Sequence, residues 1–128
     1  MAGKHVLIVD DDTEFVKLYS LFLKNSGLEV SAVYSAGEAL GAIEERNPDV
    51  VVLDVMMEHF DSGFNVSRSI KEKHPDMPVI LMTAIGEETG MDFKPKDDTE
   101  RELMHADAFL DKEASPEQLL AKINDILG

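Results

Sequence analysis

The sequence predicts an α/β fold, in which a doubly wound parallel β-sheet carries helices on both faces. Short apolar runs without polar alternation recur along the chain, which is typical of strands buried on both faces. Longer stretches with apolar residues at helical spacing lie between them, so strands and helices alternate. Four of the apolar runs end directly in polar or charged side chains, which places those side chains beyond the carboxyl ends of the strands.

The first strand is predicted at residues 6–9, and a helix is predicted at residues 14–26, where apolar side chains recur at helical spacing. Thr13 or Asp12 precedes this helix, and either side chain can accept a hydrogen bond from its free amides. Gly27 marks the end of the helix, because glycine readily adopts the left-handed conformation that follows many helices.

The second predicted strand is Glu29–Val33, and a helix from Ser35 to about Arg46 follows it. Ser35 and Glu38 have the spacing of a capping box, in which the serine oxygen and the glutamate carboxylate bond reciprocally to backbone amides. Pro48 separates this helix from the third strand, because proline interrupts helical hydrogen bonding.

The third predicted strand, Val50–Asp54, is the centre of the fold. Its apolar and mostly β-branched residues run directly into the carboxylate of Asp54. A helix follows and ends near Pro75, and the fourth strand is predicted at residues 79–82. The apolar positions of that helix are Phe64, Val66 and Ile70.

The last strand is predicted at residues 108–110, and Ser115 caps a final helix that has Pro116 at its first position. The apolar stripe of this helix consists of Leu119, Leu120, Ile123 and Leu127. The segment 86–107, before the last strand, is rich in charges and long for an ordinary connection. We expect it to be loop-like or to hold a shortened fourth helix.

Length and composition exclude several classes of protein. The 128 residues predict a single domain, and the absence of cysteine excludes disulfides, thiolate metal ligands and cysteine nucleophiles. Acidic residues outnumber basic ones 26 to 12, so the net charge of -14 disfavours direct binding of nucleic acid and favours cations and basic partners. Apolar runs are short and the start lacks a signal-peptide core, so we expect a cytoplasmic protein without a membrane partner.

Carboxylates cluster at the predicted carboxyl edge of the sheet. Asp10, Asp11 and Asp12 follow the first strand, and Asp54 ends the third. Two such charges about 4 Å apart repel by about 4 kcal/mol at an effective dielectric near 20, so the cluster needs a cation or a proton. Oxygen ligands with room for water suit Mg²⁺. Acidic residues at a helix start offer a structural alternative, which explains Asp12 but leaves Asp54 unexplained.

Thr83 and Lys112 follow the fourth and fifth predicted strands, at the same edge as Asp54. Alone, each has an ordinary reading as a strand-end hydroxyl or a surface lysine. Together they can hydrogen-bond and ion-pair with a phosphoryl group carried by Asp54. The combination predicts a phosphoryl-accepting switch.

These residues resemble the response-regulator receiver domain of bacterial two-component signalling, over nearly the whole chain. The matching motifs are Val-Asp-Asp-Asp at 9–12, Leu-Asp-Val-Met-Met at 53–57 with Asp61 and Gly63, Met-Thr-Ala at 82–84, and Phe-Leu-Asp-Lys at 109–112. The resemblance implies a flavodoxin-like five-stranded sheet in the order 2-1-3-4-5. It also implies a histidine kinase or phosphotransfer protein as phosphoryl donor, and no catalysis beyond the domain's own phosphorylation and dephosphorylation.

The resemblance implies a role for each residue of the cluster. Asp54 would accept the phosphoryl group, and Mg²⁺ would be held by Asp10, Asp11, Asp54 and the backbone carbonyl of Met56. Output is expected through another protein, from a monomer or a weak phosphorylation-dependent dimer.

The residues around the phosphoryl group are implied in the same way. Thr83, the Ala84 amide and Lys112 would bind the phosphoryl oxygens. Thr83 would then move inward and Phe109 would fill the vacated space, so that these two residues form the switch.

Two departures from the family pattern concern the surroundings of the site. Receivers usually have a cis-linked proline after the lysine, and here Glu113 takes that position. A cis bond without proline costs about 3–4 kcal/mol, so a trans bond is expected. The segment 86–107 replaces the usual fourth helix, so the output face departs from the family pattern.

Two alternatives remain open from the sequence. A haloacid-dehalogenase-like phosphatase also uses an aspartate nucleophile, but its signature requires threonine or valine where this chain has Glu14. Turnover of para-nitrophenyl phosphate would identify it. A degenerate receiver would act as a binding module whose segment 86–107 docks a partner without phosphate.

Overall fold

A computed structural model describes residues 3–54, 62–83 and 107–128 of the chain. Within them, five parallel strands form one sheet in the order β2-β1-β3-β4-β5, which confirms the predicted order. The strands are β1 (His5–Val9), β2 (Glu29–Val33), β3 (Val50–Asp54), β4 (Val79–Thr83) and β5 (Ala108–Asp111). The predictions for the fourth helix and for the segment 86–106 lie outside the described residues.

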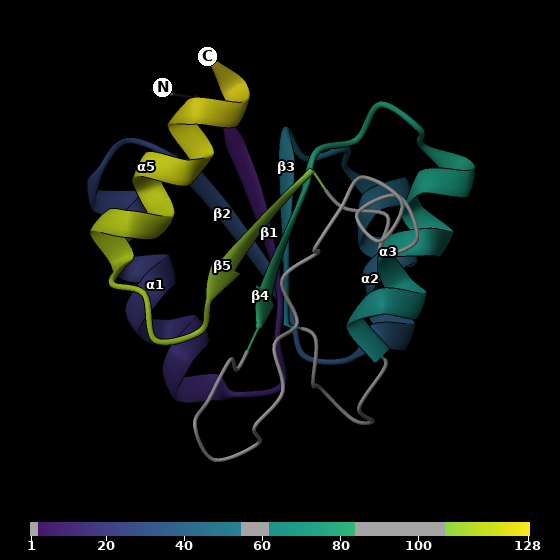
Figure 1. The fold of residues 1–128 in the computed structure, drawn as a ribbon, viewed down its shortest axis with the longest axis horizontal. Helices are drawn as coiled ribbons and strands as arrows, with labels where there is room; N and C mark the ends of the chain where they lie inside the picture. The colour runs from purple at the N-terminus through teal and green to yellow at the C-terminus, as the bar shows by residue number, and fades with distance from the viewer. Residues whose placement is uncertain (1–2, 55–61, 84–106) are drawn as a thin grey trace.

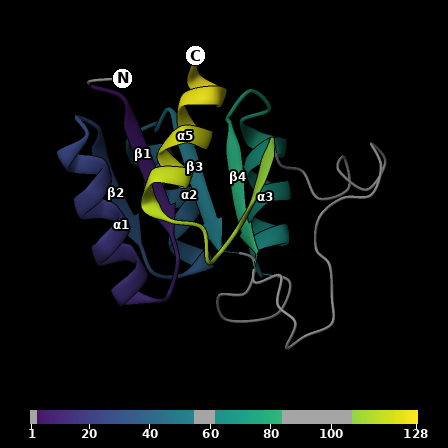
Figure 2. The same ribbon diagram turned by 60° about the vertical axis from the view of Figure 1, so that its left-hand side comes forward.

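Helices cover both faces of the sheet, with α1 and α5 on one face and α2 and α3 on the other (Figures 1 and 2). The described helices are α1 (Thr13–Asn25), α2 (Ala36–Glu45), α3 (Ser62–Lys73) and α5 (Pro116–Leu127). Their bounds agree closely with the predicted ones. Among the described residues, no helix is both long and apolar enough to cross a membrane.

Alternate residues of the central strands feed two separate hydrophobic cores. Val50 and Val52 of β3 pack with side chains of α1 and α5, whereas Val51 and Leu53 pack with side chains of α2 and α3. Every residue of β3 is buried. A strand that is apolar on both faces is therefore held between two helical layers, and its carboxyl end is fixed in position.

Three of the predicted helix ends are confirmed. The Asp12 side chain caps α1 by accepting a hydrogen bond from the amide of Phe15, at 3.1 Å. Gly27, just beyond α1, has a φ of 96°, in the left-handed region that favours glycine. At α5, Ser115 and Gln118 form a reciprocal capping box, with Pro116 at the first helical position.

The capping box predicted at the start of α2 is wrong. Ser35 is the N-cap residue, but its side chain accepts no hydrogen bond from a helix amide. Its hydroxyl instead donates to the Glu38 carboxylate, with a distance of 2.9 Å between the oxygens. The Glu38 amide, which would donate to the serine side chain in a capping box, donates to the Ser35 carbonyl oxygen at 3.3 Å, and the charge-assisted bond holds the two side chains together.

Candidate functional site

The sheet order places the polar ends of β1 and β3 side by side. Val9 of β1 lies opposite Leu53 of β3, so the next residues along the two chains, Asp10 and Asp54, meet at the carboxyl edge. Asp54 in turn lies opposite Met82 of β4, one residue before Thr83. The predicted convergence of strand ends is therefore observed.

Two of the clustered carboxylates are buried. Asp10 is 1% exposed and Asp54 is 5% exposed, whereas Asp11 is exposed. One carboxylate oxygen of each lies within 4.8 Å of the others. The Asp10 Oδ1 atom accepts a hydrogen bond of 2.9 Å from the amide of Asp12. The start of α1 thus orients Asp10 toward Asp54.

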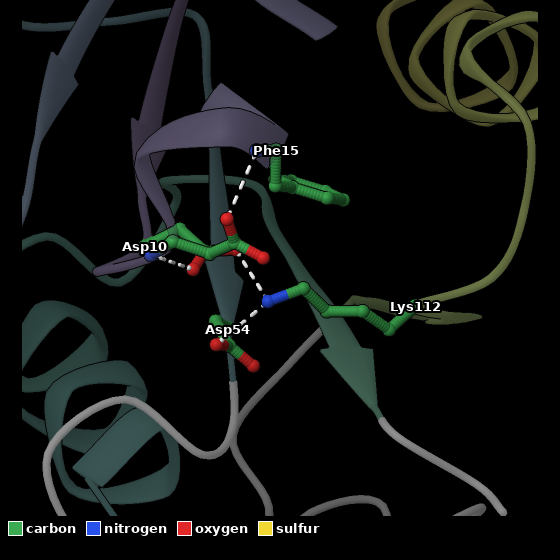
Figure 3. Close-up of polar contacts among 5 residues, drawn as sticks. Asp10, Phe15, Asp54 and Lys112 are labelled. Atoms are coloured by element: carbon green, nitrogen blue, oxygen red, sulfur yellow. Dashed lines mark hydrogen bonds and ion pairs between the residues drawn. The ribbon is translucent and has the colours of Figure 1, made fainter. Parts of the chain in front are cut away.

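The side chain of Lys112 enters this cluster from the residue after β5 (Figure 3). Its Nζ donates a hydrogen bond to Asp54 Oδ2 at 2.8 Å and lies 2.7 Å from Asp10 Oδ2. The second contact is an ion pair in which Asp10 Oδ2, a buried atom, lacks an aligned hydrogen-bond donor. Nζ also lies 4.7 Å from the centre of the Phe15 ring, within range of a cation–π contact.

Burial and neighbouring charges act in opposite directions on the pKa values of Asp10 and Lys112, and both pKa values are raised. Burial raises the pKa of the Asp10 carboxyl to about 6, although the Lys112 ammonium opposes this shift. Burial alone would lower the pKa of Lys112, but its contacts with the Asp10 and Asp54 carboxylates outweigh burial, and the pKa is raised. Lys112 therefore stays charged at neutral pH.

The residues present fit a divalent cation. The three carboxylates carry a charge of about -3 when ionised and Lys112 carries +1, which leaves -2 to be neutralised. The Asp10 Oδ2 atom is buried without an aligned donor, which is the state of an oxygen suited to a further ligand. Closely spaced carboxylates with an open, exposed member suit Mg²⁺, which takes few carboxylates and keeps its waters.

A comparison of the sequence with protein-family models identifies a known family. The model for the response regulator receiver domain matches residues 6–124, which is nearly the whole chain. The chain belongs to this family. Receivers are signalling domains rather than enzymes with an external substrate, so the haloacid-dehalogenase alternative is not supported.

Curated relatives are transcriptional regulators that contain a receiver. The chain is 34% identical to a probable transcriptional regulator, ycf27, of Guillardia theta over 95% of this chain and 44% of that protein. It is 32% identical to the phosphate regulon transcriptional regulatory protein PhoB of Pseudomonas aeruginosa, over 99% of this chain and 53% of that protein. The receiver thus spans about half the length of these relatives.

Solved structures share the fold throughout. A CheY-like receiver domain protein from Methanospirillum hungatei superposes with a TM-score of 0.82 at 27% identity, covering 98% of this chain and 94% of that one. The chemotaxis response regulator CheY4 of Vibrio cholerae gives 0.82 at 25% identity, covering 98% and 100%. The fold and the family of this receiver therefore agree.

The structure describes only some of the other predicted site residues of the receiver. Thr83 ends β4 and lies opposite Asp111 in the sheet, while Met56 and Ala84 lie outside the described residues. Phe109 of β5 is half-buried and packs against the α2–α3 core. Among the described residues no peptide bond is cis, so the bond between Lys112 and Glu113 is trans, as expected.

Two aromatic residues of α1, which the sequence shows only as apolar positions at helical spacing, also border the site of the receiver. The rings of Phe15 and Tyr19 stack with their centres 4.0 Å apart, and the Tyr19 hydroxyl donates a hydrogen bond to the Ala114 carbonyl. Their spacing of four residues predicts that they meet on one face of α1. The contact of Phe15 with Lys112 depends on tertiary packing, and no local pattern signals it.

Proposed function

We propose that this receiver is a phosphoryl-accepting switch in which Asp54 is the acceptor. The observation that carries the proposal is the buried Asp54 carboxylate beside Asp10 and 2.8 Å from Lys112 Nζ. The Asp10, Asp11 and Asp54 carboxylates together carry more negative charge than the Lys112 ammonium neutralises. Mg²⁺ that binds with the phosphoryl donor would neutralise this excess charge. Asp10, Asp11, Asp54 and the Met56 carbonyl would hold the ion.

In the proposed reaction, an Asp54 carboxylate oxygen attacks the phosphorus of a phosphohistidine on a histidine kinase or phosphotransfer protein. A phosphorus–oxygen bond forms, the phosphorus–nitrogen bond breaks, and its electron pair returns to the imidazole. The Lys112 ammonium, already beside Asp54, holds one phosphoryl oxygen. When bound, Mg²⁺ supplies positive charge that offsets the negative charge of the transferring group.

The switch follows from the new charge on Asp54. Thr83 and the Ala84 amide bind phosphoryl oxygens, and Thr83 moves inward from the end of β4. Phe109, half-buried at the α2–α3 side of the neighbouring strand, moves into the vacated space. Phosphorylation thereby biases an equilibrium between two conformations of the surface near these strands.

Acetyl phosphate and Mg²⁺ provide a direct test. Intact-protein mass spectrometry should show the addition of one phosphoryl group, and Asp54→Asn should abolish it. Asp76→Asn is the matched control, because Asp76 is an exposed acid before β4 and should label like the wild type. Labelling retained in Asp54→Asn would exclude Asp54 as the acceptor.

Membership of the receiver family supports a proposal for the partners of the switch. A cytoplasmic histidine kinase domain or phosphotransfer protein is the proposed donor, and the proposed output is contact with another protein domain rather than direct binding of nucleic acid. The receiver acts as a monomer or as a weak dimer formed on phosphorylation, and residues 1–128 act as one domain. If a partner binds wild type and Asp54→Asn equally, with or without acetyl phosphate, a phosphate-independent binding module replaces the switch.

A further inference from the structure

A groove of about 610 Å³ runs between α1 and β2, away from the acid site. We call it the α1–β2 groove. Lys17, Leu21 and Lys24 of α1, Val30 and Ser31 of β2, and Tyr34 line it. The residues of the acid site do not line it, so it is a separate surface of the molecule.

Exposed apolar side chains gather along this groove. Among the described residues, the exposed large hydrophobic side chains are Leu18, Leu21 and Tyr34, with exposures of 58%, 60% and 46%. Leu21 and Tyr34 line the groove itself, and Leu18 lies one turn from Leu21 on α1. Clustered exposure of this kind makes the groove a candidate surface for a partner.

The strand beside the groove has a free edge. Among the strands that the structure describes, β2 is the first in the sheet order and pairs with β1 alone, so one side of its backbone is unpaired within this sheet (Figure 2). Its single charged residue, Glu29, stands at its first position, and the strand contains no proline. Edge strands that must remain alone usually carry central charges, prolines or bulges, and β2 has neither a central charge nor a proline.

The charge of the α1–β2 groove is opposite to that of the whole chain. The chain carries 26 acidic residues and a net charge of -14, yet none of the described residues that line the groove is acidic. Lys17 and Lys24 line it from two turns of α1, and both are exposed. An acidic segment is therefore repelled by most of the molecule and attracted here.

We propose that the α1–β2 groove docks an extended, acidic segment of a partner protein, which adds a strand to the free edge of β2. Main-chain hydrogen bonds to β2 supply affinity. Every second side chain of the added strand faces α1, and among these apolar side chains cover Leu21 and Tyr34 while acidic ones pair with Lys17 and Lys24. Lys17 and Lys24 are seven positions apart, a rise of about 10 Å along α1 that equals about three residues of extended chain. Acidic residues two or four positions apart, whose side chains point to the same face of a strand, match this spacing.

Two fluorescein-labelled nonapeptides test the groove. Both have threonine at the odd positions and valine at positions 4 and 8, and positions 2 and 6 hold glutamate in one peptide and lysine in the other, so that valine and the charged residue share one face of the strand. By fluorescence anisotropy, the wild type should bind the glutamate peptide at least tenfold more tightly than the lysine peptide. The double variant Lys17→Glu, Lys24→Glu should lose at least tenfold in affinity. The matched control Lys73→Glu, Lys122→Glu changes the net charge equally, away from the groove, and should lose less than twofold.

Amide chemical shifts locate the bound peptide. Shifts concentrated on β2 and α1 support strand addition at this edge, and shifts elsewhere overturn it. Equal loss in both double variants, equal binding of both peptides, or failure of the glutamate peptide to bind also overturns the proposal. A concentration-dependent dimer that Leu21→Ser dissolves would instead assign the groove to a second copy of the chain.

Docking in the α1–β2 groove is independent of the proposed phosphorylation. The same titrations with Asp54→Asn should give the wild-type affinity within twofold, because Asp54 does not line the groove. Loss of peptide binding with normal labelling by acetyl phosphate would count against the groove alone. Normal peptide binding without labelling would count against the switch alone.

Discussion

Carboxylates and basic side chains meet at both the amino edge of the sheet, where the parallel strands begin, and the carboxyl edge, where they end, but their charges are balanced differently at the two places. At the amino edge, Asp49 Oδ2 accepts a hydrogen bond from the His5 amide, and Asp107 Oδ2 accepts one from the Val79 amide and another from Lys71. Each of these carboxylates has donors of its own. At the carboxyl edge, the clustered carboxylates crowd around Lys112. Polar groups whose charges balance hold a structure together, whereas three carboxylates beside one ammonium leave an excess of negative charge, which marks the place where a cation is needed.

The largest effect on stability is expected at the amino edge. Asp107→Ala removes the acceptor of the buried Val79 amide and the partner of Lys71, and should lower the free energy of unfolding by about 2 kcal/mol. Urea denaturation measures this. Asp76→Ala, a change at an exposed acid of the same edge, should cost less than about 0.5 kcal/mol. Equal losses in the two variants would remove the contrast between the edges.

At the carboxyl edge, removal of a carboxylate should have the opposite sign. Asp10→Asn keeps an oxygen for the Asp12 amide and removes a buried charge, so it should stabilise the metal-free protein by about 1 kcal/mol at pH 7. The same variant should bind Mg²⁺ at least tenfold more weakly by calorimetry. A destabilised variant, or unchanged Mg²⁺ affinity, would contradict the assignment.

The pH dependence of that gain can be derived from the pKa of Asp10. The folded-state pKa is raised to about 6 from 3.8, so the Asp10 carboxyl contributes stability below about pH 4 that is lost as the pH rises toward 6. The advantage of Asp10→Asn without metal should therefore grow from pH 4 to about 6 and then level off. Denaturation curves at several pH values measure it.

The smallest expected effect is a pH response of opposite sign at the amino edge. Burial lowers the pKa of His5, and the Arg46 guanidinium acts in the same direction. The unfolded chain then takes up a proton more readily than the folded one, so stability is lost as the pH falls below 6.5. His5→Asn should flatten this decline in urea denaturation between pH 7 and 5. An unchanged slope would show that His5 does not cause it.

Local patterns predicted the fold and the central residues of the site well. The continuous apolar run of β3 required burial on both faces, and parallel strand order then brought Asp10, Asp54 and Lys112 together. Asp12 was among the predicted caps because short polar side chains satisfy free helix amides.

The misses depend on interactions beyond local sequence. Ser35 and Glu38 have the correct spacing for a capping box, but the spacing does not decide that the Glu38 carboxylate accepts from the Ser35 hydroxyl and that the Glu38 amide donates to the Ser35 carbonyl. Asp107 was assigned to the charged segment before β5, and its bonds to residues 28 and 36 positions away have no local signal. The contact of Phe15 with Lys112 likewise joins residues that are distant in sequence.

The stack of Phe15 and Tyr19 gives the molecule a built-in optical probe. Lys112 lies over one ring, and the hydroxyl of the other bonds to the Ala114 carbonyl, just before α5. The chain contains two tyrosines and no tryptophan, and Tyr34 lies in the separate α1–β2 groove. Any displacement of the ammonium should therefore register in the near-ultraviolet emission of Tyr19, without an added dye.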